Sequence, residues 1–345
     1  MKKIQRGQSL GSEESRQLVQ AIFQEQLTEI QIAALLMGLS VKGESVGELV
    51  GFVLGMREYA VHLNHPHKNL VDTAGTGGDG SGTFNISTAA AIVIAGAGVP
   101  VAKHGNRAIS GKCGSADVLT RLGVNISAPR EVLEDCLTET GITFLFAPAF
   151  HPAMKIVGRV RKELGVRTIF NLMGPLLNPA GARRQIIGVY APHLTELVGE
   201  ALQQLGSEHA LIFCGEEGLD ELGLDSKTKV TELRAGKIET RYLTPEVLGF
   251  SRRSVHEYSG GEVEENAAIL HEILTLKRHD ARREIVILNA AAGIYVAGVA
   301  ASIADGVALA RQSLDSGAAL GKLTDLVEYT NGRKVRTREV QGSHP

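Results

Sequence analysis

The stretch VDTAGTGGDGSGTFNIST, residues 71–88, decides the fold. Five glycines lie between Gly75 and Gly82 with Asp79 among them, and the small-residue apolar run STAAAIVIAGAGV overlaps the end of the stretch. A strand that leads through a glycine loop into a helix offers bare backbone N–H groups and a positive helix end to an anion. Glycine permits both the close approach and the positive φ that such a loop needs. Glycine clusters are most often plain turns, but Asp79 and the hydroxyl groups at the helix start favour an anion-binding loop.

Two well-known phosphate loops are excluded. Residues 75–80 match the G-x-G-x-x-G pattern of dinucleotide-binding folds, but that fold also needs an acid about 20 residues later. The corresponding stretch here contains Lys103 and His104 and no acid. The Walker loop fails because Gly111-Lys112 is followed by Cys113 rather than by Ser or Thr.

Composition excludes several classes of protein. The net charge of −2 supplies no field that would recruit nucleic acid or acidic lipid, and aromatic residues make up only 4% of the chain. The cysteines, Cys113, Cys136 and Cys214, lie far apart without metal-ligand spacing, which indicates a reducing compartment. The first residues lack the apolar core of a signal peptide, and the apolar runs 89–102 and 285–301 are too interrupted for membrane spans. We therefore expect a cytoplasmic protein that binds neither membranes nor nucleic acid.

The N-terminal part of the chain predicts helices only. Ser12, Thr28 and Ser45 each precede an apolar stripe with helical spacing. We expect a small helical domain over residues 1–66, which packs on a larger body or supplies a dimer face and against which helices around 167–184 can pack.

From residue 67 to about 330 the pattern is that of an α/β domain, and 331–345 is a polar tail. Short apolar strands alternate with helical segments, which predicts a mainly parallel central sheet. The expected strands are NLVDTA, VPVAKH, ITFLFA, QIIGVY, HALIFC and, less clearly, KIETRYL, and the expected helices are 86–98, 115–122, 130–140, 194–205, 262–276 and 282–300. In such a fold, ligands bind beyond the carboxyl ends of the strands.

Three polar clusters follow expected strands or lie between elements. In KHGNRAISGKCGSAD, residues 103–117, three cations with spaced glycines favour a phosphate-rich ligand over a solvated basic turn. Farther along, His151 and the arginines at 159, 161 and 167 could recognise a carboxylate, since an arginine fork holds one bidentately. Asp220 and Glu221 follow the strand HALIFC. Beside a phosphate loop, such an acidic pair predicts Mg²⁺, which prefers one or two carboxylates plus substrate phosphates.

The ordered set GTGGD, NIST, KHGNRAIS, GSAD, HPAMK, VRKELGVRTIFNLMGPLLNP and GLDE resembles the anthranilate phosphoribosyltransferases over about residues 5–325. The resemblance implies a helical domain joined to an α/β domain of the nucleoside phosphorylase and phosphoribosyltransferase type, in a homodimer. It implies transfer of the phosphoribosyl group from 5-phosphoribosyl 1-diphosphate to the amine of anthranilate in tryptophan biosynthesis, with Mg²⁺ as cofactor.

The resemblance also implies roles for individual residues. Donor contacts fall on Gly75, Thr76, Gly77, Gly78, Asp79, Thr83, Asn85, Ile86, Ser87, Thr88, Lys103, His104, Gly105, Asn106, Arg107, Ala108, Ile109, Ser110, Gly111 and Ser115. Anthranilate contacts fall on Gly75, Asn106, Arg161, His104 and His151, and magnesium ligands on Ser87, Asp220 and Glu221. No nucleophile is implied; Lys103 and Asp79 stabilise the donor and the transition state.

Two departures and two alternatives accompany this resemblance. The chain has Ser110-Gly111 where the family commonly has Ser-Ser, and Cys113 where it often has Ser. One alternative is a pyrimidine nucleoside phosphorylase-like enzyme. The sequence KHGN and the region of Arg161 argue against it, because they favour a carboxylated aromatic acceptor. The other is a non-catalytic nucleic-acid-binding relative, against which the acidic pair and the net charge argue.

Overall fold

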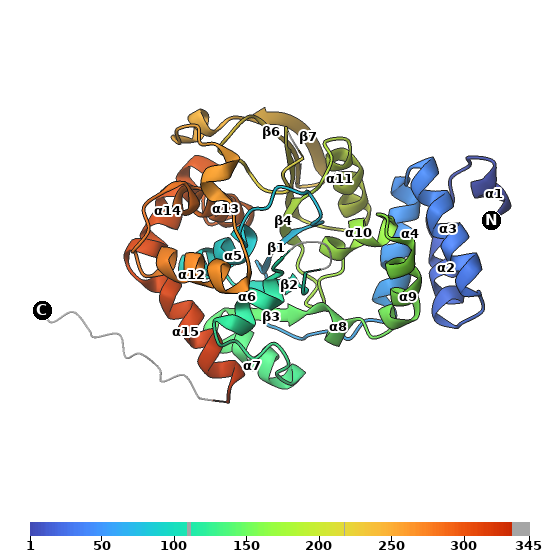
Figure 1. Ribbon diagram of the computed structural model, residues 1–345, viewed down its shortest axis with the longest axis horizontal. Coiled ribbons are helices and arrows are strands. Elements are labelled where there is room, and N and C mark those ends of the chain that lie inside the picture. The colour runs from blue at the N-terminus through green and yellow to red at the C-terminus, as the bar shows by residue number, and fades with distance from the viewer. Residues whose placement is uncertain (109–111, 217, 333–345) are drawn as a thin grey trace, which may run out of the picture.

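The N-terminal helices form a bundle at one end of the molecule (Figure 1). The structure, a computed structural model, describes residues 1–108, 112–216 and 218–332. The bundle consists of α1 (Lys2–Gln5), α2 (Ser12–Phe23), α3 (Glu29–Lys42) and α4 (Val46–Arg57). Helix α3 begins with a capping box, in which the Thr28 side chain accepts from the Gln31 N–H and Gln31 reciprocates. Ser45 and Glu48 do the same for α4. The three expected helix starts are confirmed, whereas α1 was not expected.

The centre of the molecule is one seven-stranded sheet in the order β3-β2-β1-β4-β5-β6-β7. Strands β1 to β5 run parallel to one another, whereas β6 is antiparallel to both β5 and β7. The strands are β1 (Val71–Gly75), β2 (Val101–Gly105), β3 (Ile142–Phe146), β4 (Arg184–Gly188), β5 (His209–Gly215), β6 (Thr228–Arg234) and β7 (Lys237–Leu243). The expected fold class, a helical domain with a mainly parallel α/β domain, is confirmed.

Helices cover both faces of the sheet. On one face, α5 packs against α13, α14 and α15, and its residues join the largest hydrophobic core. On the other face, α11 packs between β5 and α4, so the core of the helical bundle continues into the sheet. The remaining helices are α5 (Ile86–Gly96), α6 (Ser115–Arg121), α7 (Arg130–Thr140), α8 (Ala147–Phe150), α9 (Met154–Leu164), α10 (Ile169–Met173), α11 (Leu194–Gln204), α12 (Val263–Leu274), α13 (Ala281–Val296), α14 (Ile303–Asp315) and α15 (Ala318–Thr330), with 3₁₀ turns η1 (Gly174–Leu176), η2 (Pro245–Leu248) and η3 (Val255–Tyr258).

Strand β6 was not expected, because its sequence is rich in polar residues. Its sequence TKVTELR contains Glu232, which is buried and pairs with His209 of β5 at 2.9 Å and with Arg241 of β7 at 2.6 Å. An acid that is satisfied by neighbouring strands is compatible with a buried strand. No apolar alternation marks it in the sequence. Helices α9, α14 and α15 were also not among the expected elements. Within the described residues, no helix has both the length and the apolar composition to cross a bilayer.

The carboxyl ends of four strands meet at one side of the sheet. Each of β1, β2, β4 and β5 ends in a glycine, namely Gly75, Gly105, Gly188 and Gly215. Gly75 and Gly188 lie opposite each other in the register of β1 and β4. A row of glycines leaves room above the sheet for other chain segments to approach the backbone. This side of the sheet carries the candidate site.

Candidate functional site

The segment that carries the acidic pair fills the space above the strand ends. A β-carbon at Gly75 would lie 2.5 Å from Oδ2 of Asp220, and one at Gly188 would lie 1.6 Å from the Asp220 carbonyl oxygen. Real β-carbons do not approach other atoms this closely. The two glycines are therefore required for Asp220 to lie directly on β1 and β4.

The glycine loop wraps over Asp220. The N–H of Gly77 donates to Asp220 Oδ2 at 2.9 Å, and the N–H of Asp220 lies 3.5 Å from Oδ2 of Asp79. The loop turns through glycines with φ between 66° and 75°, which are Gly77, Gly78, Gly80 and Gly82. This is the left-handed region, which favours glycine. The loop is thus shaped by its backbone, with its acid turned toward the acidic pair.

The start of α5 is fixed by the second acid of the pair. The N–H of Ser87 donates to Glu221 Oε1 at 3.0 Å, and the Thr73 hydroxyl donates to the Ser87 carbonyl at 3.0 Å. Glu221 therefore accepts one of the N–H groups that have no partner within the helix, and its negative charge is favourable at the helix start. The hydroxyl of Ser87 is left to other partners.

Lys103 lies beneath the glycine loop rather than on its surface. The residue is 4% exposed, and its Nζ donates to the carbonyl of Thr73 and lies 3.3 Å from Oγ of Ser87. Burial lowers the pKa of Lys103, while the nearby carboxylates of Asp72, Glu221 and Asp220 act in the opposite direction. Its charge therefore acts on the site from below, through a short distance of low dielectric.

The acids of the site repel one another. Burial and the charge of Asp79 raise the pKa of Asp220 to about 7, and burial and the charge of Asp220 raise the pKa of Glu221 well above its usual range. One oxygen of each carboxylate accepts a backbone N–H, whereas no N–H or O–H of the described residues donates to the other oxygen. A divalent cation would relieve this repulsion and use these free oxygens.

The described residues do not form a complete metal cage. Among them, no group of three or more His, Cys, Asp or Glu side chains is arranged to hold a metal ion by itself. Magnesium commonly keeps waters and substrate phosphates among its ligands and needs only one or two carboxylates from the protein. Asp220, Glu221 and the Ser87 hydroxyl thus fit magnesium that is bound together with a phosphorylated substrate.

The second loop, after β2, is held by an acid that sequence reasoning missed. Oδ2 of Asp117 accepts the N–H groups of Ala108 and Gly114, both at 3.0 Å, and Oδ1 accepts the Arg107 guanidinium at 2.7 Å. A β-carbon at Gly114 would lie 2.4 Å from the Ala108 nitrogen. Asn106 is exposed at the start of this loop. The predicted donor residues Ile109, Ser110 and Gly111 lie outside the described residues.

A hydrogen-bond chain joins the two loops to the C-terminal half of the chain. The Asn85 side chain donates to the Cys113 carbonyl at 3.0 Å and accepts from the Asn266 side chain at 3.1 Å. Thr83 forms an isolated β-bridge with Ser259. Asn85 and Thr83 therefore have structural partners already. Asn266 could not have been found from its own sequence context, because EENAAIL reads as an ordinary helix.

Two buried histidines, His104 at the end of β2 and His151 after α8, contact each other. The rings of His104 and His151 form an edge contact with centroids 5.2 Å apart. His104 Nδ1 donates to the Gly174 carbonyl at 3.2 Å and His151 Nε2 to the Leu177 carbonyl at 3.1 Å, which fixes both tautomers. Burial lowers the pKa of His104 to about 3 and that of His151 to about 4. Both rings are neutral at physiological pH, and His104 Nε2 and His151 Nδ1 have no partner among the described residues.

The structure separates the three arginines that the sequence grouped. Arg159 forms surface ion pairs with Glu163 and Glu29. Arg161 is half-buried, its guanidinium carbon lies 5.3 Å from the centroid of the Phe170 ring, and it has no hydrogen-bond or ion-pair partner in the described part of the chain. Burial lowers its pKa. Arg167 donates to the carbonyl of Gly78 in the glycine loop. Of the three arginines, Arg161 is therefore the one whose guanidinium is desolvated and has no hydrogen-bond or ion-pair partner among the described residues.

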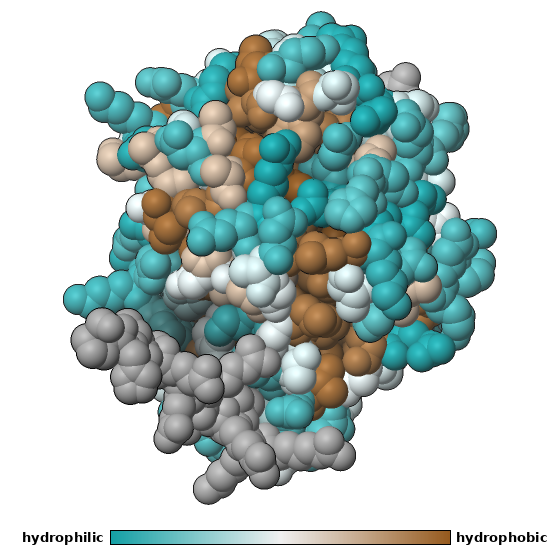
Figure 2. Space-filling view, turned by 90° about the vertical axis from the view of Figure 1, so that its left-hand side faces the viewer, coloured by the Kyte–Doolittle hydropathy of each residue, from teal (hydrophilic) through white to brown (hydrophobic). Residues whose placement is uncertain are grey.

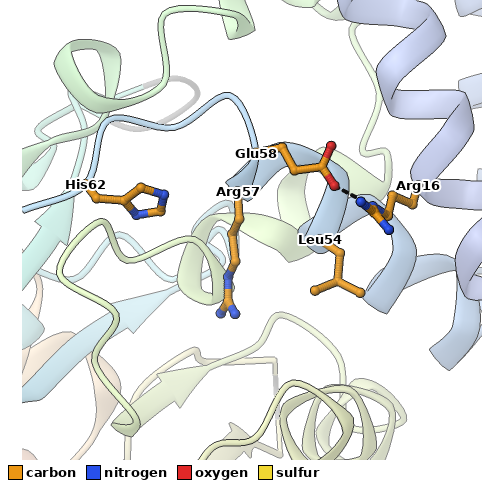
Figure 3. Close-up of a pocket in the computed structure, with 5 residues that line it drawn as sticks. All are labelled: Arg16, Leu54, Arg57, Glu58 and His62. Carbon is orange, nitrogen blue, oxygen red and sulfur yellow. Dashed lines mark hydrogen bonds and ion pairs between the residues drawn. The ribbon is translucent and has the colours of Figure 1, made fainter.

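A separate cavity lies at the helical bundle. It has a volume of about 410 Å³ and is lined by Arg16, Leu54, Arg57, Glu58 and His62 (Figure 3). None of these is a predicted site residue, and Arg16 and Glu58 pair with each other across it. Arg57 donates to the Leu176 carbonyl at 2.9 Å. The cavity does not coincide with the candidate site.

Comparisons with known proteins agree over nearly the whole chain. The family model described as "Glycosyl transferase family, a/b domain" matches residues 67–320, and the one described as "Glycosyl transferase family, helical bundle domain" matches residues 1–60. The anthranilate phosphoribosyltransferase of Pelotomaculum thermopropionicum is 48% identical over 96% of this chain and 95% of its own length. That of Moorella thermoacetica is 47% identical over 95% and 96%.

Solved structures give the same result. A crystal structure of the anthranilate phosphoribosyltransferase from Thermus thermophilus is 44% identical with a TM-score of 0.91, covering 96% of this chain and 99% of that one. The Saccharomyces cerevisiae enzyme, solved in complex with PRPP and Mg, is 28% identical with a TM-score of 0.85, covering 93% and 94%. Sequence and fold thus agree on the same family.

Proposed function

Because the chain belongs to the anthranilate phosphoribosyltransferase family, we propose that the strand ends around Gly75 and Asp220 form the site where it transfers a phosphoribosyl group. The donor is 5-phosphoribosyl 1-diphosphate, the acceptor is the amine of anthranilate, and the products are N-(5-phosphoribosyl)anthranilate and diphosphate. This reaction is a step of tryptophan biosynthesis. The contacts between the glycine loop and the acidic pair are the observation that carries the assignment of the site.

The donor occupies the glycine loop and the start of α5. Departure of diphosphate from C1 of the ribose leaves oxocarbenium character behind, so the protein must chiefly stabilise charge on the leaving group. The amides of Gly78, Gly80 and Gly82 are available for this, because they have no acceptor among the described residues, whereas those of Gly77 and Ser81 already donate to Asp220 and Asp79. Lys103 adds a positive charge from beneath the loop at 3.3 Å from the Ser87 hydroxyl. Asp79 is half-buried at the loop, with Oδ2 3.5 Å from the N–H of Asp220, and would stabilise the donor from there.

Ser87, Asp220 and Glu221 would hold magnesium together with the donor's phosphates. The ion would supply positive charge against the departing diphosphate. The unshared carboxylate oxygens and the raised pKa values of the two acids support this assignment. The yeast relative, whose solved complex contains PRPP and Mg, supports the use of magnesium.

Anthranilate lies between the second loop and α9. Arg161 binds its carboxylate, since a desolvated guanidinium without a partner is prepared for a charge-assisted hydrogen bond. Asn106, Gly75 and the neutral rings of His104 and His151 complete the acceptor side. The arylamine is neutral at pH 7, so no strong base is needed before it attacks C1.

Among the described residues, no activated nucleophile lies at this site. Burial raises the pKa of Cys113 and that of Cys214 to about 11, so both thiols stay protonated. The transfer therefore occurs in one displacement at C1, without a ribosylated protein intermediate.

A fluorescence assay tests the function directly. Anthranilate is mixed with enzyme, donor and Mg²⁺, and loss of its fluorescence is followed together with the release of diphosphate. We expect one diphosphate for each anthranilate consumed. The variant Glu216→Gln should behave as the wild type in this assay and serves as the control for variants of the acidic pair. Glu216 is an exposed acid of the same region, and it pairs with Lys227. An enzyme that ignores anthranilate but cleaves a pyrimidine nucleoside in the presence of phosphate would contradict the proposal.

The helical bundle supplies the surface for a homodimer. Ile30 and Val41 of α3 are 81% and 80% exposed and, being eleven residues apart, lie on the same side of the helix. Helices α12, α14 and α15, at the opposite end of the molecule, carry no exposed large hydrophobic residue within the described chain. On this side of the molecule, hydrophobic and hydrophilic residues alternate over the surface (Figure 2). Light scattering should give twice the monomer mass, and Ile30→Glu with Val41→Glu should halve it.

The domain boundaries and the cellular location complete the proposal. We place the helical domain at residues 1–66, with α9 and α10 packed on α3 and α4, and the catalytic domain at 67–330. We assign the enzyme to the cytoplasm. Cys113, Cys136 and Cys214 are free thiols, which supports a reducing compartment.

A further inference from the structure

Arg167 connects three separate parts of the molecule. It lies in the turn between α9 and α10, and its backbone carbonyl accepts the hydroxyl of Ser40, on α3, at 3.1 Å. Its guanidinium carbon lies 4.1 Å from the centroid of the Tyr190 ring, which follows β4. The same guanidinium donates to the carbonyl of Gly78. One residue thus joins the helical bundle, the sheet and the glycine loop.

The other hydrogen bonds to the glycine loop come from a different part of the molecule than the one from Arg167. Gly188 accepts from Thr76, Asp220 accepts from Gly77, and Gly260 donates to Gly82. Those three partners all belong to the α/β domain. Within the described residues, Arg167 is the one partner of the loop that comes from the segment packed on the helical bundle.

The hydrogen bond to Gly78 is one that a donor substrate can replace. Arg167 is exposed, and in the described part of the chain no carboxylate forms an ion pair with it; its guanidinium contacts only a carbonyl oxygen and the face of Tyr190. A phosphate oxygen is a much stronger acceptor for a guanidinium than a neutral carbonyl is. A diphosphate bound at the loop would therefore compete for Arg167.

We propose that Arg167 is a positioning residue that couples donor binding at the glycine loop to the acceptor side of the site. Before the donor binds, Arg167 holds the loop through Gly78, and when the donor binds, the guanidinium turns to its phosphate oxygens. Because the turn that carries Arg167 also ends α9, this exchange orients the helix that bears Arg161. The inference rests on the proposed function, since it assigns the loop to the donor.

The coupling can be measured without turnover. Inorganic diphosphate with Mg²⁺ serves as the probe for the donor site, because it cannot ribosylate anthranilate. Anthranilate binding is titrated by fluorescence with and without the probe, and the ratio of the two dissociation constants gives the coupling. For the wild type we expect the probe to tighten anthranilate binding about fivefold or more, the lower end of typical coupling between sites.

Three variants separate positioning from simple structure. Arg167→Ala should abolish the ratio and weaken binding of the probe, whereas Arg167→Lys should retain part of both. Tyr190→Leu should reduce the ratio because it removes the ring under the guanidinium, and Tyr190→Phe should keep it. Arg159→Ala is the matched control, since Arg159 lies on α9 but pairs only with surface acids.

The outcomes distinguish this inference from the function on which it rests. A wild type that turns over anthranilate but shows a ratio of one, or an Arg167→Ala variant that keeps the wild-type ratio, would overturn the inference alone. A wild type without turnover would overturn the proposed function. Thermal unfolding of each variant shows whether the fold is intact, and Arg167→Lys keeps the test decisive if Arg167→Ala does not fold.

Discussion

Asp220 lies against the backbone of Gly75 so closely that a single β-carbon at position 75 would come within 2.5 Å of the Asp220 carboxylate. The acid is fixed at the same time by the N–H of Gly77 at 2.9 Å. Strand end, loop and acid therefore form one unit, and a change in any of them moves the others.

Gly75→Ala should disable the enzyme without unfolding it. The new methyl group would displace Asp220 from its place on β1, and misplacement of about 1 Å near the chemistry can cost about a hundredfold in rate. We expect kcat/KM to fall by about that factor, measured by anthranilate fluorescence. Gly158→Ala is the control, since a β-carbon there meets nothing within 4 Å. Equal activity of the two variants would show that Asp220 is not held by Gly75.

Asp220→Asn should weaken the dependence on magnesium. The substitution keeps the shape of the side chain and removes a charge that magnesium would bind. We expect the half-saturating Mg²⁺ concentration to rise about tenfold or more, since even outer-shell partners of a metal contribute that much. An unchanged Mg²⁺ titration curve would remove Asp220 from the metal site, and Glu216→Gln should behave as the wild type.

Arg161→Ala should affect the acceptor far more than the donor. Loss of a charge-assisted hydrogen bond of about 1.5–3 kcal/mol corresponds to a rise of about 10- to 100-fold in the KM for anthranilate. The KM for the donor should stay near that of the wild type. Steady-state kinetics with each substrate varied in turn measure both constants. Comparable rises in the two constants would argue against Arg161 as the carboxylate ligand.

The buried histidines should make the fold sensitive to acid. The pKa values of His104 and His151 in the folded chain, about 3 and about 4, lie below the ordinary value near 6.5. The unfolded chain thus takes up protons first, so this stability is complete above pH 6.5 and is lost as the pH falls toward 4. Each ring contributes at most about 1.4 kcal/mol per pH unit. Urea unfolding between pH 7.5 and 5.5 should show a shallower slope for His104→Gln than for the wild type, whereas the exposed His279→Gln should not alter the slope.

The donor alone should leave the protein unmodified. With no activated nucleophile among the described residues of the site, incubation with 5-phosphoribosyl 1-diphosphate and Mg²⁺ should give the mass of the unmodified chain. Intact-protein mass spectrometry after rapid acid quenching measures this. A mass increase of one phosphoribosyl group would contradict direct displacement.

The local parts of the site could be predicted from the sequence, because each is written in consecutive residues. The loop over 75–82, the acids at 220 and 221 and most strands were found in this way. The burial of Lys103 could not be predicted, because it depends on Thr73 and Ser87 from neighbouring elements. Strand β6 was hidden by Glu232, which is satisfied only by residues of other strands and of α13. The contact between Arg167 and Gly78 joins residues that are 89 positions apart in the sequence, so no local sequence pattern predicts it.

The glycines of the site fall into two classes with different evolutionary freedom. At Gly77, Gly80 and Gly82 a β-carbon would meet nothing within 4 Å, so only the positive φ restricts the residue. Asn and Asp tolerate that conformation at modest cost, and related sequences can drift to them at these positions. At Gly75 and Gly188 the obstacle is Asp220: its carboxylate at Gly75 and its backbone at Gly188. Saturation mutagenesis should therefore give a graded tolerance at Gly77, Gly80 and Gly82, loss of activity at Gly75, where a side chain displaces the carboxylate, and the least tolerance at Gly188.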